Sequence, residues 1–84
     1  MTNEAIVKQI EAKSLSDKLL NIHFKQRSTI TGLFIKTNDY HELKSKNLWR
    51  IVTKIHVDEW RKTNDINLCR IFNGTEFTRL SEVN

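Results

Sequence analysis

Short runs in which apolar and polar residues alternate are the feature of this chain that most limits its fold. The first run alternates from Leu20 through Ile22 to Phe24. A period of two residues is typical of a strand that buries one face. Similar runs follow at residues 29–37 and 47–55, and two shorter ones lie near the C-terminus. The pattern therefore predicts a mainly β domain with five short strands.

The run at residues 29–37 differs from the others because it is apolar on both faces. Ile30 and Phe34 share one face with Gly32, while Leu33 and Ile35 lie on the other. A strand of this kind suits a closed or strongly curved sheet, and a glycine within a strand allows a sharp bend. We therefore predict a small, strongly bent five-stranded barrel.

A short helix is predicted before the strands, at about residues 3–13. Ile6 and Ile10 are four residues apart, and the positions between them are mostly good helix formers. Thr2 or Asn3 is a suitable N-cap. Because 84 residues suffice for one small core, residues 1–84 are assigned to a single domain whose barrel covers about residues 18–81.

Three segments are less clearly specified by the pattern. Residues Tyr40 to Lys46 are compatible with a helical turn or an irregular loop. Residues 56–65 are polar and predict a loop, with at most one helical turn around Trp60. Asn73-Gly74 lies between two β-rich runs and predicts a tight hairpin turn with positive φ at both residues. The register of that hairpin depends on whether the turn is bulged.

The amino-acid composition indicates the cellular compartment in which the protein resides. The chain has no proline and one cysteine, Cys69, so it contains no internal disulfide framework and fits a reducing compartment. No run approaches the length of a membrane span, and the N-terminus lacks the apolar region of a signal peptide. We expect a cytoplasmic protein.

Positive charge is concentrated in the middle of the chain. Residues 18–55 carry eight basic side chains against two acidic ones, a net charge of +6, whereas residues 1–17 and 56–84 each sum to −1. Clustered cations beside aromatic rings favour single-stranded nucleic acid. The predicted nucleic-acid-binding residues are Lys25, Arg27, Lys36, Tyr40, His41, Lys44, Lys46 and Arg50. The alternative is that these side chains only keep the surface solvated.

The order of a helix, three strands, a loop and a terminal hairpin resembles the Sm-like family, whose members form small five-stranded barrels that assemble as rings on RNA. The residues that match its first motif without gaps are Phe24, Ile30, Gly32, Phe34, Asn38 and Tyr40. The second motif is matched by Ile71-Phe72-Asn73-Gly74 and then Phe77. The resemblance implies a self-associating RNA-binding barrel. Other SH3-like barrels have a similar strand pattern.

No pattern of residues indicates an enzyme, a metal site or a cofactor. The three histidines are fifteen or more residues apart and Cys69 is solitary, unlike the closely spaced ligand pairs of zinc sites. There is no phosphate-binding loop and no nucleophile beside a base. Trp49 is assigned to the core, and Trp60 either covers one end of the barrel or anchors an interface.

Two functions follow from these features. The first is a non-enzymatic, self-associating barrel that binds RNA or single-stranded DNA. Free strand edges in a chain without proline favour the self-association. The second is a protein-interaction module, without a nucleic-acid role, that uses a strand edge or Trp60.

Overall fold

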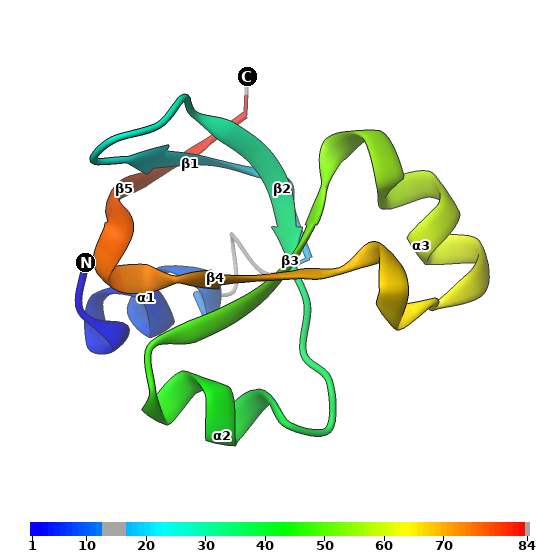
Figure 1. The fold of residues 1–84 in the computed structure, drawn as a ribbon, viewed down its shortest axis with the longest axis horizontal. Coiled ribbons are helices and arrows are strands. Elements are labelled where there is room, and N and C mark those ends of the chain that lie inside the picture. The colour runs from blue at the N-terminus through cyan, green and yellow to red at the C-terminus, as the bar shows by residue number, and fades with distance from the viewer. Residues whose placement is uncertain (13–16, 84) are drawn as a thin grey trace.

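The alternating runs form five antiparallel strands in the computed structural model, which describes residues 1–12 and 17–83 (Figure 1). The strands are β1 (Leu20–Phe24), β2 (Ile30–Phe34), β3 (Leu48–Thr53), β4 (Arg70–Asn73) and β5 (Phe77–Glu82). The helices are α1 (Asn3–Ile10), α2 (Tyr40–Ser45) and α3 (Val57–Thr63), with single 3₁₀ turns η1 (Lys54–His56), η2 (Ile66–Leu68) and η3 (Gly74–Glu76). A β-rich fold with five strands and a short N-terminal helix is thus confirmed, whereas the helices α2 and α3 add more helix than the prediction of a mainly β domain allowed.

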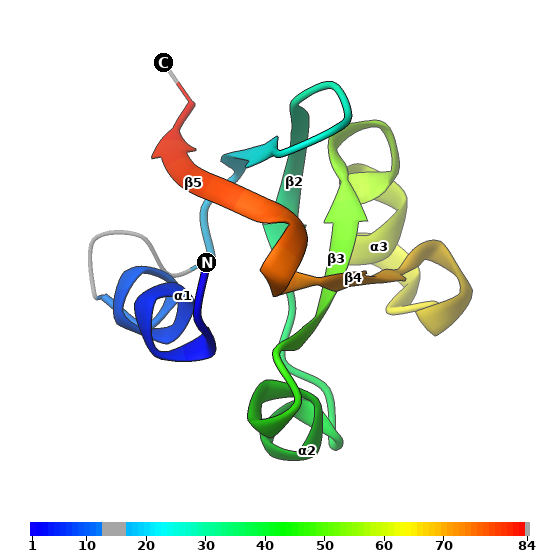
Figure 2. The ribbon, with the colours of Figure 1, turned by 60° about the vertical axis from the view of Figure 1, so that its left-hand side comes forward.

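The sheet has the strand order β4-β3-β2-β1-β5 and is strongly bent (Figure 2). β1 and β4 are separated by two strands, which in a flat sheet places them about 14 Å apart. Yet the ring centroids of Phe24 in β1 and Phe72 in β4 are only 5.8 Å apart. The sheet therefore curls around the core, but within residues 1–12 and 17–83 β4 and β5 each pair with a single neighbour, so the predicted barrel is not closed.

The concave face of the sheet holds the main core. Trp49, Ile51 and Phe77 are at most 2% exposed there. α1 docks on this core through Ile6 and Ile10, which are also buried. The Thr2 hydroxyl caps the helix by accepting a hydrogen bond from the Ala5 N–H. The helix ends at Ile10, earlier than the predicted residue 13, which lies outside the described residues.

A second apolar cluster explains why β2 is apolar on both faces. Leu33 and Ile35 of β2 pack with Val52 and Val57, and the partly buried Trp60 lies against them. α3 therefore covers the convex side of the sheet, and the second face of β2 is buried within one chain.

The prediction of a loop at residues 56–65 was wrong for most of that segment, because α3 spans Val57–Thr63. Its acidic residues Asp58 and Glu59 lie in the first turn and its basic residues Arg61 and Lys62 in the last, which complements the helix dipole. Asn64 ends the helix in the left-handed conformation, with φ of 53°.

The predicted Asn73-Gly74 hairpin was also wrong. Asn73 has φ of −89° and its side chain caps the 3₁₀ turn η3, and neither glycine of the chain has a positive φ. β5 pairs with β1 instead of β4. Residue 74 must be a glycine because its backbone packs closely against two neighbouring side chains. An added Cβ would overlap the Asn47 side chain and would lie 2.6 Å from Ile6 Cδ1.

Gly32 likewise serves close packing. A Cβ at this residue would lie 2.6 Å from Ile51 Cγ2 and 2.9 Å from the Val52 carbonyl oxygen of β3.

The segment from Tyr40 to Lys46, which the sequence left open between a helical turn and a loop, forms the helix α2 over Tyr40–Ser45. Over the described ranges, no helix has the length and apolar character that crossing a membrane requires.

Candidate nucleic-acid interface

The predicted nucleic-acid-binding residues do not share one face of the domain. Lys25 and Arg27 lie in the connection between β1 and β2, whereas His41 and Lys44 lie on α2. These two segments are at opposite ends of the molecule in both views (Figures 1 and 2). Any single contact surface therefore uses only part of the predicted set.

Arg50 on β3 is held by an ion pair with Asp39. Its Nη2 lies 2.7 Å from Asp39 Oδ2, and its Nε donates to Oδ1 at 3.3 Å. The Thr37 hydroxyl donates to the same carboxylate. The hydrogen bond from Arg50, followed by that from Thr37, lowers the pKa of Asp39 to about 2. Because its charge is already compensated, Arg50 is a weaker phosphate ligand than the sequence suggested.

Tyr40 is buried at the junction of α1, α2 and the core. Only 8% of the residue is exposed, and its hydroxyl donates to Glu11 Oε2 at 2.7 Å. Burial, and then the hydrogen bond to Glu11, raise the pKa of Tyr40, while the hydrogen bond from Tyr40 lowers the pKa of Glu11. The ammonium groups of Lys36 and Lys44 each lie 5.3 Å from the centroid of the Tyr40 ring. The buried Tyr40 ring thus lies beneath the ammonium groups of Lys36 and Lys44, and little of its surface is left for a nucleobase to stack on.

The remaining α2 cations differ in their availability. Lys44 Nζ lies 3.5 Å from Glu11 Oε2, and Lys46 Nζ lies 3.5 Å from Glu42 Oε1. The second pair is exposed and spaced by four residues on α2, an arrangement that contributes little to stability. His41 is exposed beside Tyr40, with their ring centroids 5.4 Å apart.

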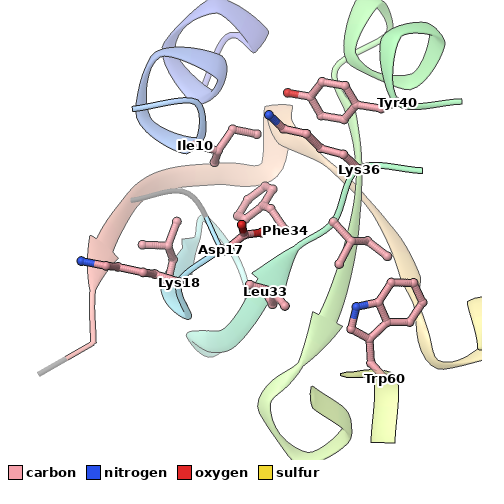
Figure 3. Close-up of a pocket in the computed structure, with 10 residues that line it drawn as sticks. Ile10, Asp17, Lys18, Leu33, Phe34, Lys36, Tyr40 and Trp60 are labelled. Carbon is pink, nitrogen blue, oxygen red and sulfur yellow. The ribbon is translucent and has the colours of Figure 1, made fainter. Parts of the chain in front are cut away.

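A cleft of about 420 Å³ brings Lys36, Tyr40 and Trp60 together (Figure 3). It opens where α1 and the start of β1 face the end of β2 and the start of α2. Both apolar clusters supply its walls, with Phe34 from the main core and Leu33 and Trp60 from the outer cluster. We name it the Trp60 cleft, and its lining is Ile10, Asp17, Lys18, Leu20, Leu33, Phe34, Ile35, Lys36, Tyr40 and Trp60.

Charged groups lie at the rim of the Trp60 cleft. Figure 3 shows the Asp17 carboxylate directed toward Phe34, the Lys36 ammonium reaching toward Tyr40, and Lys18 extending outward. Within residues 1–12 and 17–83, three ion pairs are formed, and neither Lys18 nor Lys36 takes part in them. The two exposed lysines outnumber the single acidic group of the lining, so the rim is net positive.

Trp60 packs over one face of the sheet, whereas the sequence predicted a cover for one end of a barrel or an interface anchor. The side chain is half-buried and packs against the cluster of Leu33, Ile35 and Val52, so it does cover this side of the sheet. The same ring forms one wall of the cleft. Its role as an interface anchor stays a prediction.

Comparisons with family models, curated proteins and solved structures found no match. The function of the candidate site must therefore be inferred from its geometry alone. In the part of the chain that the structure describes, no three His, Cys, Asp or Glu side chains are grouped so that they could hold a metal ion.

Sequence reasoning missed Asp17 and Lys18 as site residues. Both precede β1, and Lys18 belongs to the basic segment, but nothing in the local pattern indicates that they face the end of β2. In the structure Asp17 has φ of 58°, a conformation that Asp and Asn adopt more readily than most residues, but the sequence alone does not show it.

Proposed function

We propose that this protein is a non-enzymatic domain that binds single-stranded nucleic acid in the Trp60 cleft. The observation that carries the proposal is an aromatic wall beside two exposed lysines that form no ion pair among the described residues. Stacking rings flanked by cations are the combination that sequence-tolerant binding of single strands uses.

Each part of the cleft has a distinct role in this proposal. A nucleobase stacks on the Trp60 indole above the apolar floor formed by Leu33 and Phe34. The flanking phosphates contact Lys18 and Lys36, which release condensed counterions. The Lys44 ammonium also lies over the Tyr40 ring and extends the positive rim, with its charge partly compensated by Glu11.

Asp17 gives the cleft a means of reading the base edge. Its carboxylate accepts hydrogen bonds only, so it favours the amino groups of cytosine, adenine and guanine over uracil, whose single N3–H donor lies between two carbonyl oxygens. We therefore expect weaker binding of oligouridine than of oligocytidine. Asp17→Asn is the appropriate test, because asparagine tolerates the left-handed backbone at this residue.

The same proposal includes a barrel family for the fold and a cellular location for the protein. The bent sheet is proposed to be an open form of the Sm-like or SH3-like barrel, which the order of a helix followed by five short strands supports. A cytoplasmic location is proposed because Cys69 is a free thiol.

Reversing the charge of both rim lysines tests the nucleic-acid proposal. Lys18→Glu with Lys36→Glu is expected to weaken binding of a fluorescein-labelled single-stranded RNA by about tenfold or more, equivalent to about 1.4 kcal/mol. The slope of log K against log salt is expected to fall by about 1.4, since about 0.7 is lost per phosphate contact. Fluorescence anisotropy at several salt concentrations measures both quantities.

The matched control changes net charge by the same amount elsewhere. Lys8 and Lys54 are exposed and do not line the Trp60 cleft. Lys8→Glu with Lys54→Glu is expected to leave the salt slope unchanged. An equal loss in both double variants would show that binding depends only on net charge and would reject the cleft as the site.

Self-association is proposed through the outer edge of β5. Within the described residues, this six-residue strand pairs with β1 alone. A two-fold antiparallel pairing centred on Leu80 would set Thr78 opposite Glu82 of the second copy, twice. The same edge on both subunits closes the assembly as a dimer.

A charge swap tests the dimer. Thr78→Glu places like charges opposite each other with Glu82 and is expected to weaken the dimer by about 0.4–2 kcal/mol over the two symmetric pairs. Combining Thr78→Glu with Glu82→Lys is expected to restore it, because each facing pair then joins opposite charges. Sedimentation velocity measures the dimer fraction, and a monomer at every concentration would reject the proposal.

A further inference from the structure

A groove runs along the outer edge of β4, on a different part of the molecule from the Trp60 cleft. Its volume is about 330 Å³, and Gln26 and Arg27 of the β1–β2 connection face Ile71, Phe72 and Asn73 of β4 across it. We name it the β4-edge groove. None of its lining residues lines the Trp60 cleft.

The backbone of β4 forms one side of this groove. β4 is a terminal strand that is hydrogen-bonded to β3 in the register Leu48↔Asn73 to Ile51↔Arg70. No other strand pairs with it in the described part of the chain. The N–H and C=O groups of its outer edge are therefore available to an added strand.

Two guanidinium groups lie over aromatic rings of the groove, that of Arg27 among its lining residues and that of Arg70 beside the lining, over Phe72. Arg27 Cζ is 5.1 Å from the Phe24 ring centroid and 5.7 Å from that of Phe72, and Arg70 Cζ is 5.5 Å from the Phe72 centroid. Neither arginine forms an ion pair within the described ranges. A guanidinium stacked on a ring keeps its N–H groups free at its rim, where they bind a carboxylate in bidentate fashion.

The opposite face of β4 is apolar at its centre. Ile71 is 48% exposed although it is a large hydrophobic residue, while the neighbouring Phe72 is buried on the face that carries the arginines. Side chains of an added strand alternate between the two faces. Those on the arginine face meet cations, and those on the other face meet Ile71.

We propose that the β4-edge groove binds an extended peptide by strand addition, and that the peptide alternates acidic and apolar side chains. The backbone edge supplies affinity, Arg27 and Arg70 select the acidic positions, and Ile71 selects the apolar ones. A nucleic-acid strand fits this groove less well, because it has no peptide groups to pair with the backbone edge of β4. The inference does not depend on the proposed function of the Trp60 cleft.

The experiment uses a fluorescein-labelled decapeptide of alternating Glu and Val as the probe. The wild-type chain is expected to bind it with a dissociation constant of about 10–100 μM. Arg27→Glu with Arg70→Glu is expected to weaken binding by about tenfold or more. Lys8→Glu with Lys54→Glu, which makes the same change in net charge, is expected to alter it by less than about twofold.

Two further arms distinguish strand addition from simple charge attraction. The same decapeptide N-methylated at alternate residues keeps its charge but loses backbone donors, and it is expected to bind at least about tenfold more weakly. The exposed change Ile71→Lys is expected to weaken the unmodified peptide by a similar factor.

Several results would overturn the proposal. Equal binding of the N-methylated and unmodified peptides would exclude strand addition. No binding at about 1 mM peptide, far above the expected constant, would exclude the site. Displacement of the probe by single-stranded RNA, in a manner lost with Arg27→Glu, would reassign the groove to nucleic acid. Displacement by unlabelled protein, with dimer formation lost in Ile71→Lys, would reassign it to a second copy of this chain.

Discussion

Phe77→Ala is expected to lower the free energy of unfolding by about 3–5 kcal/mol, which is most of the stability of a small domain. Phe77 is fully buried, at 0% exposure. Its ring contacts Phe24 edge-on, with centroids 5.2 Å apart, and lies 6.4 Å from Phe34. It also begins β5 beside Phe24 of β1, so its loss leaves a cavity where the sheet curls most. Urea denaturation followed by tryptophan fluorescence measures the change.

A matched truncation separates burial from mere loss of an apolar side chain. Ile71→Ala removes an apolar side chain that is 48% exposed, and it is expected to cost less than about 1 kcal/mol. Phe77→Leu keeps most of the volume and is expected to fall between the two alanine variants. If Phe77→Ala were no more destabilising than Ile71→Ala, the curled core described above would be incorrect.

The elements that could be predicted from the sequence are those with a local periodic signal. β1 and β3 follow from alternation, β2 follows from a short run that is apolar on both faces, and α1 follows from the spacing of Ile6 and Ile10. Trp49 was correctly assigned to the core, since it lies within such a run and is 2% exposed. These signals depend only on neighbouring residues, which is why they can be read without knowledge of the tertiary structure.

The elements that could not be predicted depend on partners far along the chain. Asn73-Gly74 is a strong local hairpin signal, but β5 pairs with β1, more than fifty residues away, and the turn is shaped by Asn47. The helix α3 has a weak apolar stripe because only Val57 and Trp60 of its residues pack against the sheet. Tertiary packing therefore overrode the local preference in both segments.

The residues of the candidate site likewise divide into features that the sequence predicts and features that only the folded chain reveals. Composition located the excess of positive charge, but the pairing of those charges is a tertiary property. Arg50 of β3 forms an ion pair with Asp39, which lies in the β2–β3 connection. Tyr40 donates a hydrogen bond to Glu11, which lies in the segment that follows α1. Each contact removes a residue from the predicted binding surface for a reason that linear spacing does not reveal. The Trp60 cleft was equally hidden, because Lys18 and Trp60 lie on segments that meet only in the folded chain.

Asn47 joins three separate segments, and its replacement is expected to have the second largest effect on stability. Its Nδ2 donates to the Met1 carbonyl oxygen at 2.9 Å, and its Oδ1 accepts from Trp49 Nε1 at 2.8 Å. Its own carbonyl oxygen accepts from the Gly74 N–H at 2.8 Å. Asn47 also has a φ of 58°, which asparagine tolerates better than most residues. The side chain of Asn47 thus joins the N-terminus to the Trp49 indole, and its main-chain carbonyl holds the β4–β5 connection.

Asn47→Ala is expected to cost about 2–4 kcal/mol, because it leaves the Trp49 N–H without its partner and places a Cβ-bearing residue of low tolerance at positive φ. Asn47→Gly loses the same side-chain hydrogen bonds without the backbone strain, so it is expected to be more stable than Asn47→Ala by up to about 1 kcal/mol. Asn47→Asp keeps the acceptor for Trp49 and the tolerance of positive φ, and it is expected to be the mildest of the three. Thermal and urea unfolding of the series give this order. If alanine were tolerated as well as aspartate, the hydrogen bond to Trp49 would not stabilise the fold.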